Sequence, residues 1–131
     1  MSEELRASAP GTFGQIRVAA AAITFADGTV KIDDLAVGDV VTRVWVEVLT
    51  AFNAGTTNVL TVGTGSGANG YIGSAAVTEG TPGVYPTDGA AGGPFAAVSS
   101  AVALNVKYAQ TGTAATTGSA KAYAIITSLP A

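Results

Sequence analysis

Apolar and polar residues alternate in short runs along most of the chain. The clearest run, residues 38–52 (GDVVTRVWVEVLTAF), is rich in β-branched and aromatic residues, and its period of two predicts a long β-strand. One face is expected to hold Val40, Thr42, Val44, Val46 and Val48, and the other Val41, Arg43, Trp45, Glu47 and Leu49. Because both faces carry bulky side chains, we expect this strand at the centre of a sheet.

Turn-forming residues separate three pairs of such runs, and each pair predicts a β-hairpin. ITFADGTVKI (residues 23–32) turns at Asp27-Gly28, a strong short-range hairpin signal. NAGT (53–56) joins the long strand to TNVLTVG (57–63), and TGTAATTG (111–118) joins two further runs at 99–110 and 119–129. The residues expected to be buried are Val44, Val46, Val48, Leu60, Val62, Val106 and Ile125.

Strands spaced by about ten residues, with glycine, proline and asparagine in the turns, predict an all-β fold, an antiparallel β-sandwich. We expect less than about a tenth of the chain in helix, against a usual third. The 131 residues suit one domain, placed at 14–131 behind an N-terminal arm at 1–13. Residues 63–97 are rich in glycine and proline, and they predict a long, exposed loop that is functional or is ordered by a partner.

Charged residues make up only 11% of the chain, whereas a soluble domain usually has about a quarter. So few charges favour self-association, and we expect a homo-oligomer, in the first instance a trimer. The net charge of −3 argues against a nucleic-acid-binding protein, which would normally have a basic surface. The longest apolar run, residues 18–23, is too short to cross a bilayer, and acidic residues stand where a signal peptide needs positive charge. We therefore expect synthesis in a cytoplasm and no membrane partner.

Catalytic chemistry has few candidate residues. The chain has no cysteine and no histidine, which excludes thiolate nucleophiles, Cys/His zinc sites and histidine-based triads. A G-x-G-x-x-G pattern occurs at Gly65, Gly67 and Gly70, with Asp88 at the distance of a ribose-binding acid. Further glycines leave no room for the helix that a dinucleotide site needs, so we interpret the pattern as a loop.

Three other sites are possible from residue type. Asp33, Asp34 and Asp39 carry oxygens that calcium prefers, although aspartates are also common in turns. Asp27 and Glu79 are acids of the kind that glycosidases pair. The aromatic residues Trp45, Tyr71 and Tyr85 are candidates for a sugar-stacking platform, with Trp45 interpreted instead as core or subunit interface. We expect no enzyme activity, no cofactor and no bound metal.

Two segments are predicted to contact a partner because neither has a strand pattern. These are the N-terminal arm and the glycine-rich loop. The candidate contact residues are Glu3, Glu4, Arg6, Phe13, Tyr71, Tyr85 and Phe95.

Residues 40–127 resemble capsid decoration (head auxiliary or cement) proteins of tailed bacteriophages and related virion β-sandwich proteins. The similar features are the strand followed by FNAGTTNVLTVG, the glycine-rich stretch ending near GVY, and QTGTAATTGSAKAYAII near the C-terminus. The resemblance implies a jelly-roll-like sandwich and a non-enzymatic virion component on the capsid surface. Its partners would be the major capsid protein or other virion subunits, often with the protein as a trimer.

Two other classes of function remain open. A carbohydrate- or receptor-binding module of a phage tail or fibre would show Tyr71, Tyr85 or Trp45 exposed together over a groove. A carboxylate-based hydrolase would need two acids about 5–10 Å apart in a cleft.

Overall fold

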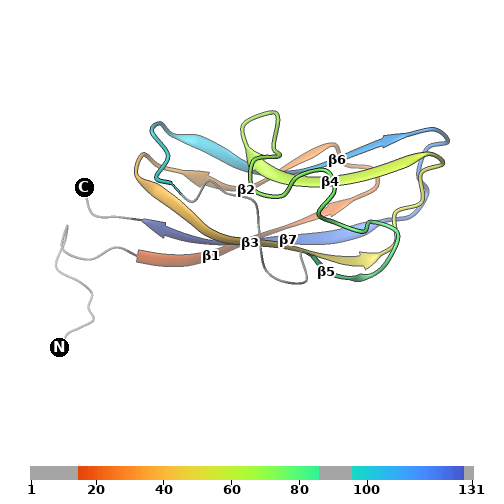
Figure 1. Cartoon of the computed structure of the whole chain (residues 1–131), viewed down its shortest axis with the longest axis horizontal. Helices are drawn as coiled ribbons and strands as arrows, with labels where there is room; N and C mark the ends of the chain where they lie inside the picture. Colours follow the sequence, from red (N-terminus) through yellow and green to blue (C-terminus); the bar gives the residue numbers. More distant parts are fainter. Residues whose placement is uncertain (1–14, 86–95, 129–131) are drawn as a thin grey trace.

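Residues 15–85 and 96–128 of the computed structural model are described; they contain seven strands and no helix. The strands are β1 (Gln15–Thr24), β2 (Thr29–Leu35), β3 (Asp39–Thr50), β4 (Thr57–Thr64), β5 (Gly83–Tyr85), β6 (Val102–Thr111) and β7 (Ser119–Ser128). They form a four-stranded sheet in the order β1-β7-β3-β5 and a three-stranded sheet in the order β2-β6-β4. Every pairing is antiparallel, and the sheets lie face to face (Figure 1). The predicted antiparallel β-sandwich is confirmed.

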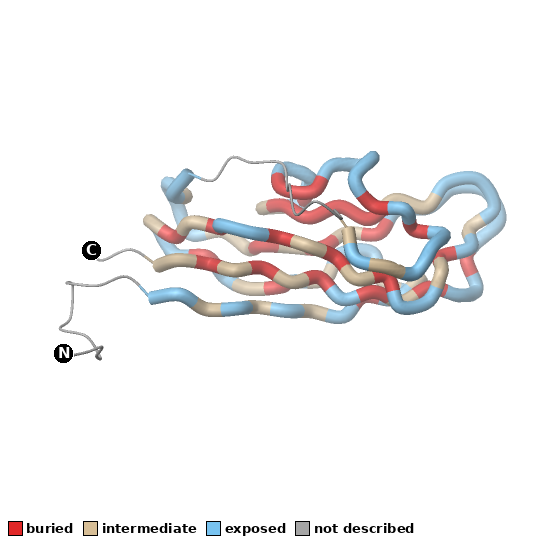
Figure 2. The backbone as a smooth tube through the Cα atoms, turned by 60° about the horizontal axis from the view of Figure 1, so that its bottom comes forward, coloured by how far each residue is buried: buried red, intermediate tan, exposed pale blue. Residues whose placement is uncertain are grey.

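The core lies between the sheets, and buried positions alternate with more exposed ones along the strands (Figure 2). Six of the seven predicted core residues are buried, namely Val44, Val46, Val48, Leu60, Val62 and Val106. The seventh prediction is wrong, because Ile125 is only partly buried and its neighbour Ile126 is fully buried. The inward face of β7 consists of Ala120, Ala122, Ala124 and Ile126, which places Ile125 on the outer face.

The alternation of β3 is interrupted near its start. The ladder with β7 shifts between Val41 and Arg43, which is a β-bulge at Thr42. The extra residue reverses the faces of the preceding residues, so Val41 is fully buried and Val40 only partly. The predicted assignment of these two valines is therefore wrong, whereas the central position of β3 is confirmed.

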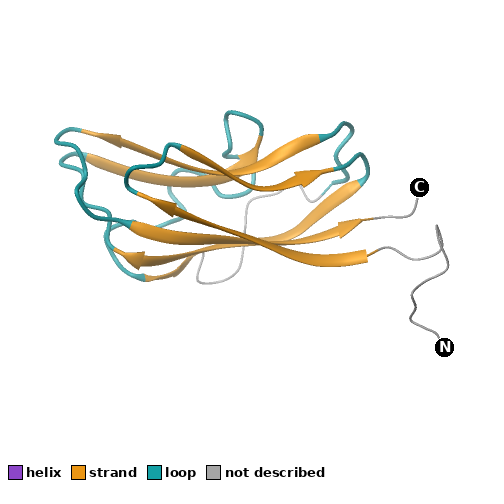
Figure 3. Cartoon of the chain, turned by 180° about the vertical axis from the view of Figure 1, so that it is seen from behind, coloured by secondary structure: helices purple, strands orange, loops and turns teal. Residues whose placement is uncertain are grey.

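The connections between consecutive strands all pass from one sheet to the other (Figure 3). None of the three predicted hairpins forms. At Asp27-Gly28, the Phe25 N–H still donates to the Gly118 carbonyl beside β7, at 3.1 Å. Three residues later the Gly28 carbonyl accepts from the Tyr108 N–H of β6, at 2.8 Å. This turn is a corner between the sheets.

The other two predicted hairpin loops pack against each other. The Gly55 N–H donates to the Thr113 carbonyl at 2.8 Å. The Asn53 side-chain oxygen accepts from the N–H groups of Thr116 and Thr117, at 2.8 and 3.0 Å. One amide side chain therefore joins the β3–β4 and β6–β7 connections at the same end of the sandwich.

The glycine-rich segment after β4 folds back on that strand. Val62 and Ile72 exchange backbone hydrogen bonds at 3.1 and 2.9 Å. Gly63 allows this close approach, because a Cβ there would lie 2.5 Å from the N atoms of Asn69 and Gly70. Ile72 is fully buried and Val77 nearly so, which corrects the prediction of an extended, exposed loop. β5 also lies within the predicted loop, and residues 86–95 lie outside the described residues.

No helix in the described ranges has the length and apolar character needed to cross a membrane.

Candidate interaction surfaces

The outer face of the four-stranded sheet carries several large apolar side chains. The outer apolar face, as we name it, consists of Ile16, Val18, Val40, Trp45, Tyr123 and Ile125. The register places Val18 opposite Ile125 and Tyr123 opposite Trp45. Ile16 and Val18 are 74% and 65% exposed. Contiguous exposed apolar side chains of this kind are typical of protein–protein contact surfaces.

An aromatic pair lies at the centre of this face. The rings of Trp45 and Tyr123 are stacked, with centroids 5.3 Å apart and an interplanar angle of 14°. The Arg43 guanidinium lies 5.8 Å from the Trp45 ring centroid, within cation–π range. Trp45 is thus on the outer face and not in the core, which leaves its interpretation as a subunit-interface residue as a prediction.

The three candidate residues for an aromatic platform do not come together. Trp45 lies on the outer apolar face, whereas Tyr71 is only 5% exposed and lines a pocket on the segment after β4. Tyr85 is on β5, and its hydroxyl donates to the Thr81 carbonyl at 2.7 Å. The expectation that Tyr71 is an exposed contact is wrong, because the chain reversal at Ile72 carries its ring inward.

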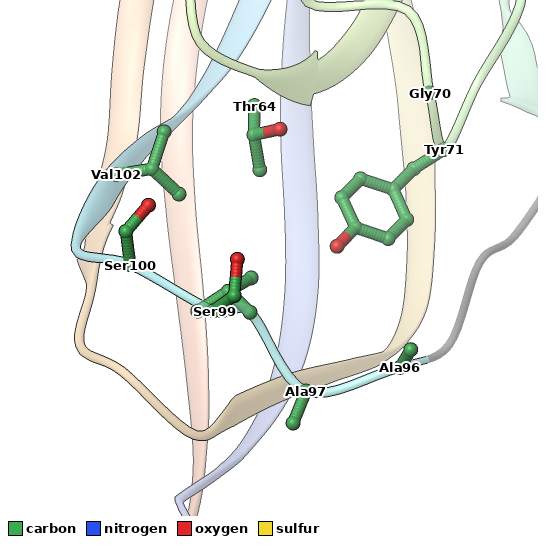
Figure 4. Close-up of a pocket in the computed structure, with 9 residues that line it drawn as sticks. Thr64, Gly70, Tyr71, Ala96, Ala97, Ser99, Ser100 and Val102 are labelled. Carbon is green, nitrogen blue, oxygen red and sulfur yellow. The ribbon is translucent and has the colours of Figure 1, made fainter.

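The pocket around Tyr71 has a volume of about 320 Å³. Hydroxyl groups from Thr64, Tyr71, Ser99 and Ser100 line it together with Val102. Figure 4 shows the Tyr71 ring pointing into this space towards residues 96–100. Burial raises the pKa of the Tyr71 hydroxyl, so the group is neutral at physiological pH. The pocket offers small polar contacts and no charged side chain among its lining residues.

The three candidate calcium ligands are used in ion pairs. The Arg17 Nε atom lies 2.8 Å from Asp33 Oδ2, and Arg17 Nη2 lies 3.2 Å from Asp39 Oδ2. Asp34 pairs with Lys31 at 3.1 Å. The described residues contain no group of three acids or other metal ligands that would hold a metal ion. Asp33 and Asp39 thus pair with the same arginine, whereas Asp34 pairs with Lys31.

Asp39 is the most buried member of this cluster. Burial alone would raise the pKa of its carboxyl, but hydrogen bonds from the Ala36 N–H, the Ser128 hydroxyl and Arg17 outweigh burial and lower the pKa. The cluster joins β1, β3 and the end of β7, and Asp33 connects it to β2. It is a structural junction that sequence spacing alone does not reveal.

The two candidate hydrolase acids have separate structural roles. Asp27 Oδ2 accepts from the Thr24 N–H at 2.9 Å in the corner after β1. Glu79 is 8% exposed, and its Oε2 accepts from the Leu60 N–H at 2.8 Å. Burial raises the pKa of Glu79, although this hydrogen bond partly opposes the effect. Both carboxylates are thus committed to backbone contacts.

The glycine pattern forms a loop, as predicted. Gly65 has a φ of 69°, in the left-handed region, and the chain then reverses towards Ile72 without a helix. Six of the candidate residues, Glu3, Glu4, Arg6, Phe13, Asp88 and Phe95, lie outside the described residues.

Sequence reasoning missed Ile16 and Val18 as surface residues. Within QIRVAAAAIT, Ile16 and Val18 lie an odd number of positions from Ile23, so in a strand they point to the face opposite Ile23. One of these two faces must point away from the core. The sequence does not show that the face with Ile16 and Val18 is the exposed one, because both faces of the strand carry apolar side chains.

Two solved bacteriophage capsid structures contain chains that superpose on this one. A chain of the cyanophage Pam1 capsid asymmetric unit gives a TM-score of 0.63 at 21% identity, covering 98% of this chain and 95% of its own. A chain of the acidic stable capsid structure of Helicobacter pylori bacteriophage KHP30 gives 0.63 at 16% identity, covering 90% and 94%. The fold is that of a chain found in phage capsids. The resemblance to virion β-sandwich proteins is therefore confirmed at the level of the fold.

No family model matches the sequence, and no curated protein matches it significantly.

Proposed function

We propose that this protein is a non-enzymatic structural component of a bacteriophage virion that decorates and stabilises the capsid. The observation that carries the proposal is the superposition on chains of two phage capsid structures, over at least 90% of every chain involved. Its partners are the major capsid protein or other virion subunits, and its place is the capsid surface after synthesis in the host cytoplasm. No nucleic acid or membrane is involved.

The surface of the sandwich supports this proposal. Charged residues are scarce throughout the chain, and the outer apolar face presents Ile16, Val18 and the Trp45–Tyr123 pair to solvent. Such a face gains free energy when it packs against another subunit, because apolar surface is removed from water. The two acids considered for catalysis, Asp27 and Glu79, accept hydrogen bonds from backbone N–H groups.

The strand order also supports the jelly-roll interpretation. Successive strands alternate between two antiparallel sheets, and the first and last strands are neighbours in the four-stranded sheet. Jelly rolls have eight strands in two sheets and are common in viral capsid proteins. Here seven strands are present in the described residues, and the segment carrying Ile72 and Glu79 covers the margin of β4 where another strand would add.

Electron microscopy of empty capsids from the encoding phage tests the proposal. Purified protein is mixed with capsids that lack it, and the expected result is added density at regular surface positions. A Trp45→Ala variant is expected to bind less, with Val37→Ala as a matched exposed control on the β2–β3 turn. Capsids that stay bare at saturating protein would overturn the assignment.

The proposal includes a homo-oligomer, with a trimer as the expected state. The support is the low charge of the chain and the trimeric state common among decoration proteins that the sequence resembles. Light scattering at micromolar concentration is expected to give about three times the chain mass of 12.8 kDa.

We also propose that the N-terminal arm and the residues around Tyr85 and Phe95 contact the capsid. Deletion of residues 1–12 is then expected to leave the melting temperature unchanged, since the sandwich starts at Gln15. Attachment to capsids is expected to weaken at least tenfold, about 1.4 kcal/mol. Equal attachment by the truncated chain would remove the arm from the contact.

A carbohydrate- or receptor-binding module of a tail or fibre is the alternative, and the hydroxyl-lined pocket at Tyr71 is the feature that favours it. Titration with host-surface oligosaccharides, followed by NMR shifts near Ser99 and Ser100, tests it. Shifts that disappear in Tyr71→Phe would support the alternative.

A further inference from the structure

The two sheets have four margins, formed by β1 and β5 in one sheet and by β2 and β4 in the other. A strand at a margin leaves about half of its backbone N–H and C=O groups without a ladder partner. Such a strand can pair with another chain, and proteins usually protect it by shortness, charge, bulges or a covering segment.

Three of these margins carry such protection. β5 has only three residues. β2 presents Lys31 and Asp34 to solvent, and its ladder is interrupted by a bulge after Lys31. β4 is covered by the segment after it, since Val62 bonds to Ile72 and the Leu60 N–H bonds to Glu79.

β1 has none of these features among the described residues. It is ten residues long and pairs with β7 in unbroken register from Gln15 to Thr24. Its single charged side chain, Arg17, is held by Asp33 and Asp39 and so does not guard the margin. Figure 2 shows β1 as the lowermost strand, with mostly exposed and intermediate positions along its length.

We infer that β1 is a self-association edge, which pairs antiparallel with β1 of a second copy about a twofold axis at Ala19. The partner is a second copy of the chain, because β1 is the unprotected margin among the described strands and every copy presents the same margin. The inference concerns the isolated chain and holds whether or not the protein binds a capsid.

The side chains fit this register. In an antiparallel pair, directly opposed residues point to the same face. Residues 16, 18, 20 and 22 of one copy therefore lie opposite members of the same set in the other copy. A centre at Ala19 places Ile16 opposite Ala22 and Val18 opposite Ala20, so that each bulky side chain meets a small one. Arg17 then faces Ala21 and not a second arginine, which avoids like-charge repulsion. A centre at Ala20 would instead put Arg17 opposite Ile23, the buried end of the strand.

Pairing also covers two of the three most exposed large apolar side chains among the described residues. Ile16 and Val18 would each gain neighbours on the partner strand, and the two outer apolar faces would become one continuous surface. The two four-stranded sheets would join into one eight-stranded sheet. This twofold contact is separate from the proposed threefold association, and it would link one trimer to the next at protein concentrations above the micromolar range in which the trimer is expected.

Site-specific cross-linking tests the register, because the chain has no cysteine of its own. In the Ala19→Cys variant, two copies would bring their thiols face to face at the twofold axis. Mild oxidation is expected to give a disulfide-linked dimer on a non-reducing gel, and reduction is expected to return it to the monomer. Leu49→Cys, 49% exposed on β3, is the control and is expected to stay monomeric. Equal or slower cross-linking at position 19 than at position 49 would overturn the inference.

Sedimentation velocity of the full-length protein, at concentrations above the micromolar range, gives an independent measurement. Val18→Lys places a charge at the centre of the contact and is expected to halve the mass of the associated species. Val84→Lys, 47% exposed on the short strand β5 at the opposite margin, is the matched control and is expected to leave the mass unchanged. An unchanged mass for Val18→Lys, or equal loss in both variants, contradicts the β1 contact.

Discussion

The Glu79 carboxylate accepts a hydrogen bond from the backbone N–H of Leu60, with Oε2 and N 2.8 Å apart. Leu60 belongs to β4, the last strand of the three-stranded sheet, so this N–H has no carbonyl of a further strand to meet. Both residues are buried. A side-chain oxygen therefore completes the margin of the sheet, and it does so from a segment 19 residues further along the chain.

We predict that Glu79→Ala lowers the free energy of unfolding by about 2 kcal/mol. A buried N–H without an acceptor costs about 1–3 kcal/mol, because it loses its hydrogen bonds to water and gains none in return. Glu79→Gln keeps an oxygen acceptor and should lower the free energy of unfolding clearly less than Glu79→Ala. Urea unfolding at pH 7 measures the difference, and Glu47→Gln on the outer face of β3 serves as control. Equal losses for the Ala and Gln variants would show that the acceptor is unimportant.

Glu79 should also make stability depend on pH. Burial raises its pKa in the folded protein above the unfolded value of about 4.3, so folding favours the protonated form. The stabilisation that protonated Glu79 contributes to the fold is fully present below the unfolded pKa and is lost as the pH rises through the folded pKa. The stability of the wild type relative to Glu79→Gln should therefore fall as the pH rises above the unfolded pKa of about 4.3. A difference that stays constant over this rise in pH would contradict the shift.

Asp39 should act in the opposite direction. Hydrogen bonds from Ala36, Ser128 and Arg17 lower its folded pKa despite its burial. Its contribution is present above the unfolded pKa of about 3.9 and is lost as pH falls through the folded pKa. Asp39→Asn should thus be less stable than the wild type at pH 6, and the difference should shrink as the pH falls below the unfolded pKa of about 3.9. Asp34→Asn, with a side chain 76% exposed, is the control and should change the stability at pH 6 much less than Asp39→Asn does.

Gly63→Ala should disrupt the fold-back after β4. The added Cβ would lie 2.5 Å from the backbone N atoms of Asn69 and Gly70, which cannot move without breaking the Val62–Ile72 bridge. We expect a loss of about 2 kcal/mol, as for overpacked cores. Gly70→Ala in the same segment meets nothing within 4 Å and should cost much less. A thermal melt of both variants gives the comparison, and similar melting temperatures would contradict the close-approach argument.

Val46→Ala should cost on the order of 2 kcal/mol, from lost apolar burial and the cavity left between the sheets. Val46 is fully buried on β3, the strand that lies between β7 and β5. Val84→Ala removes the same atoms from a side chain that is 47% exposed and should change stability by less than half as much. Denaturant melts of the pair measure this, and a negligible loss for Val46→Ala would remove the strand from the core.

The sequence predicts the strands well but not their partners. Alternation along β3 correctly places Val44, Val46 and Val48 inside, because one side of a strand must face the core. The same reasoning fails for Val40 and Val41, since the bulge at Thr42 inserts one residue without a visible signal. Asp27-Gly28 correctly marks a turn, but turn chemistry is local and does not say whether the chain returns to the same sheet. The corner forms because Gly28 bonds to Tyr108, a residue 80 positions away.

Candidate surfaces are harder to predict than strands. The glycine pattern at Gly65 is correctly interpreted as a loop from the missing helix signal. Tyr71 could not be placed, because its burial depends on the bridge between Val62 and Ile72. The exposure of Ile16 follows from the position of β1 at a sheet margin, which is a property of the whole fold.

The pairing of β1 with β7 has a consequence for the newly made chain. Within the described residues β1 has β7 as its sole ladder partner, from Gln15 opposite Ser128 to Thr24 opposite Ser119. β1 is synthesised before the other strands, so it remains without its partner β7 until nearly all of the remaining described chain has been made. During that interval Ile16, Val18 and Ile23 are all open to water and to other nascent chains. The four-stranded sheet closes late and through very long-range contacts, which makes folding slow. The yield of folded protein in the cell should therefore depend on how well chaperones protect the first strand while the last is being synthesised.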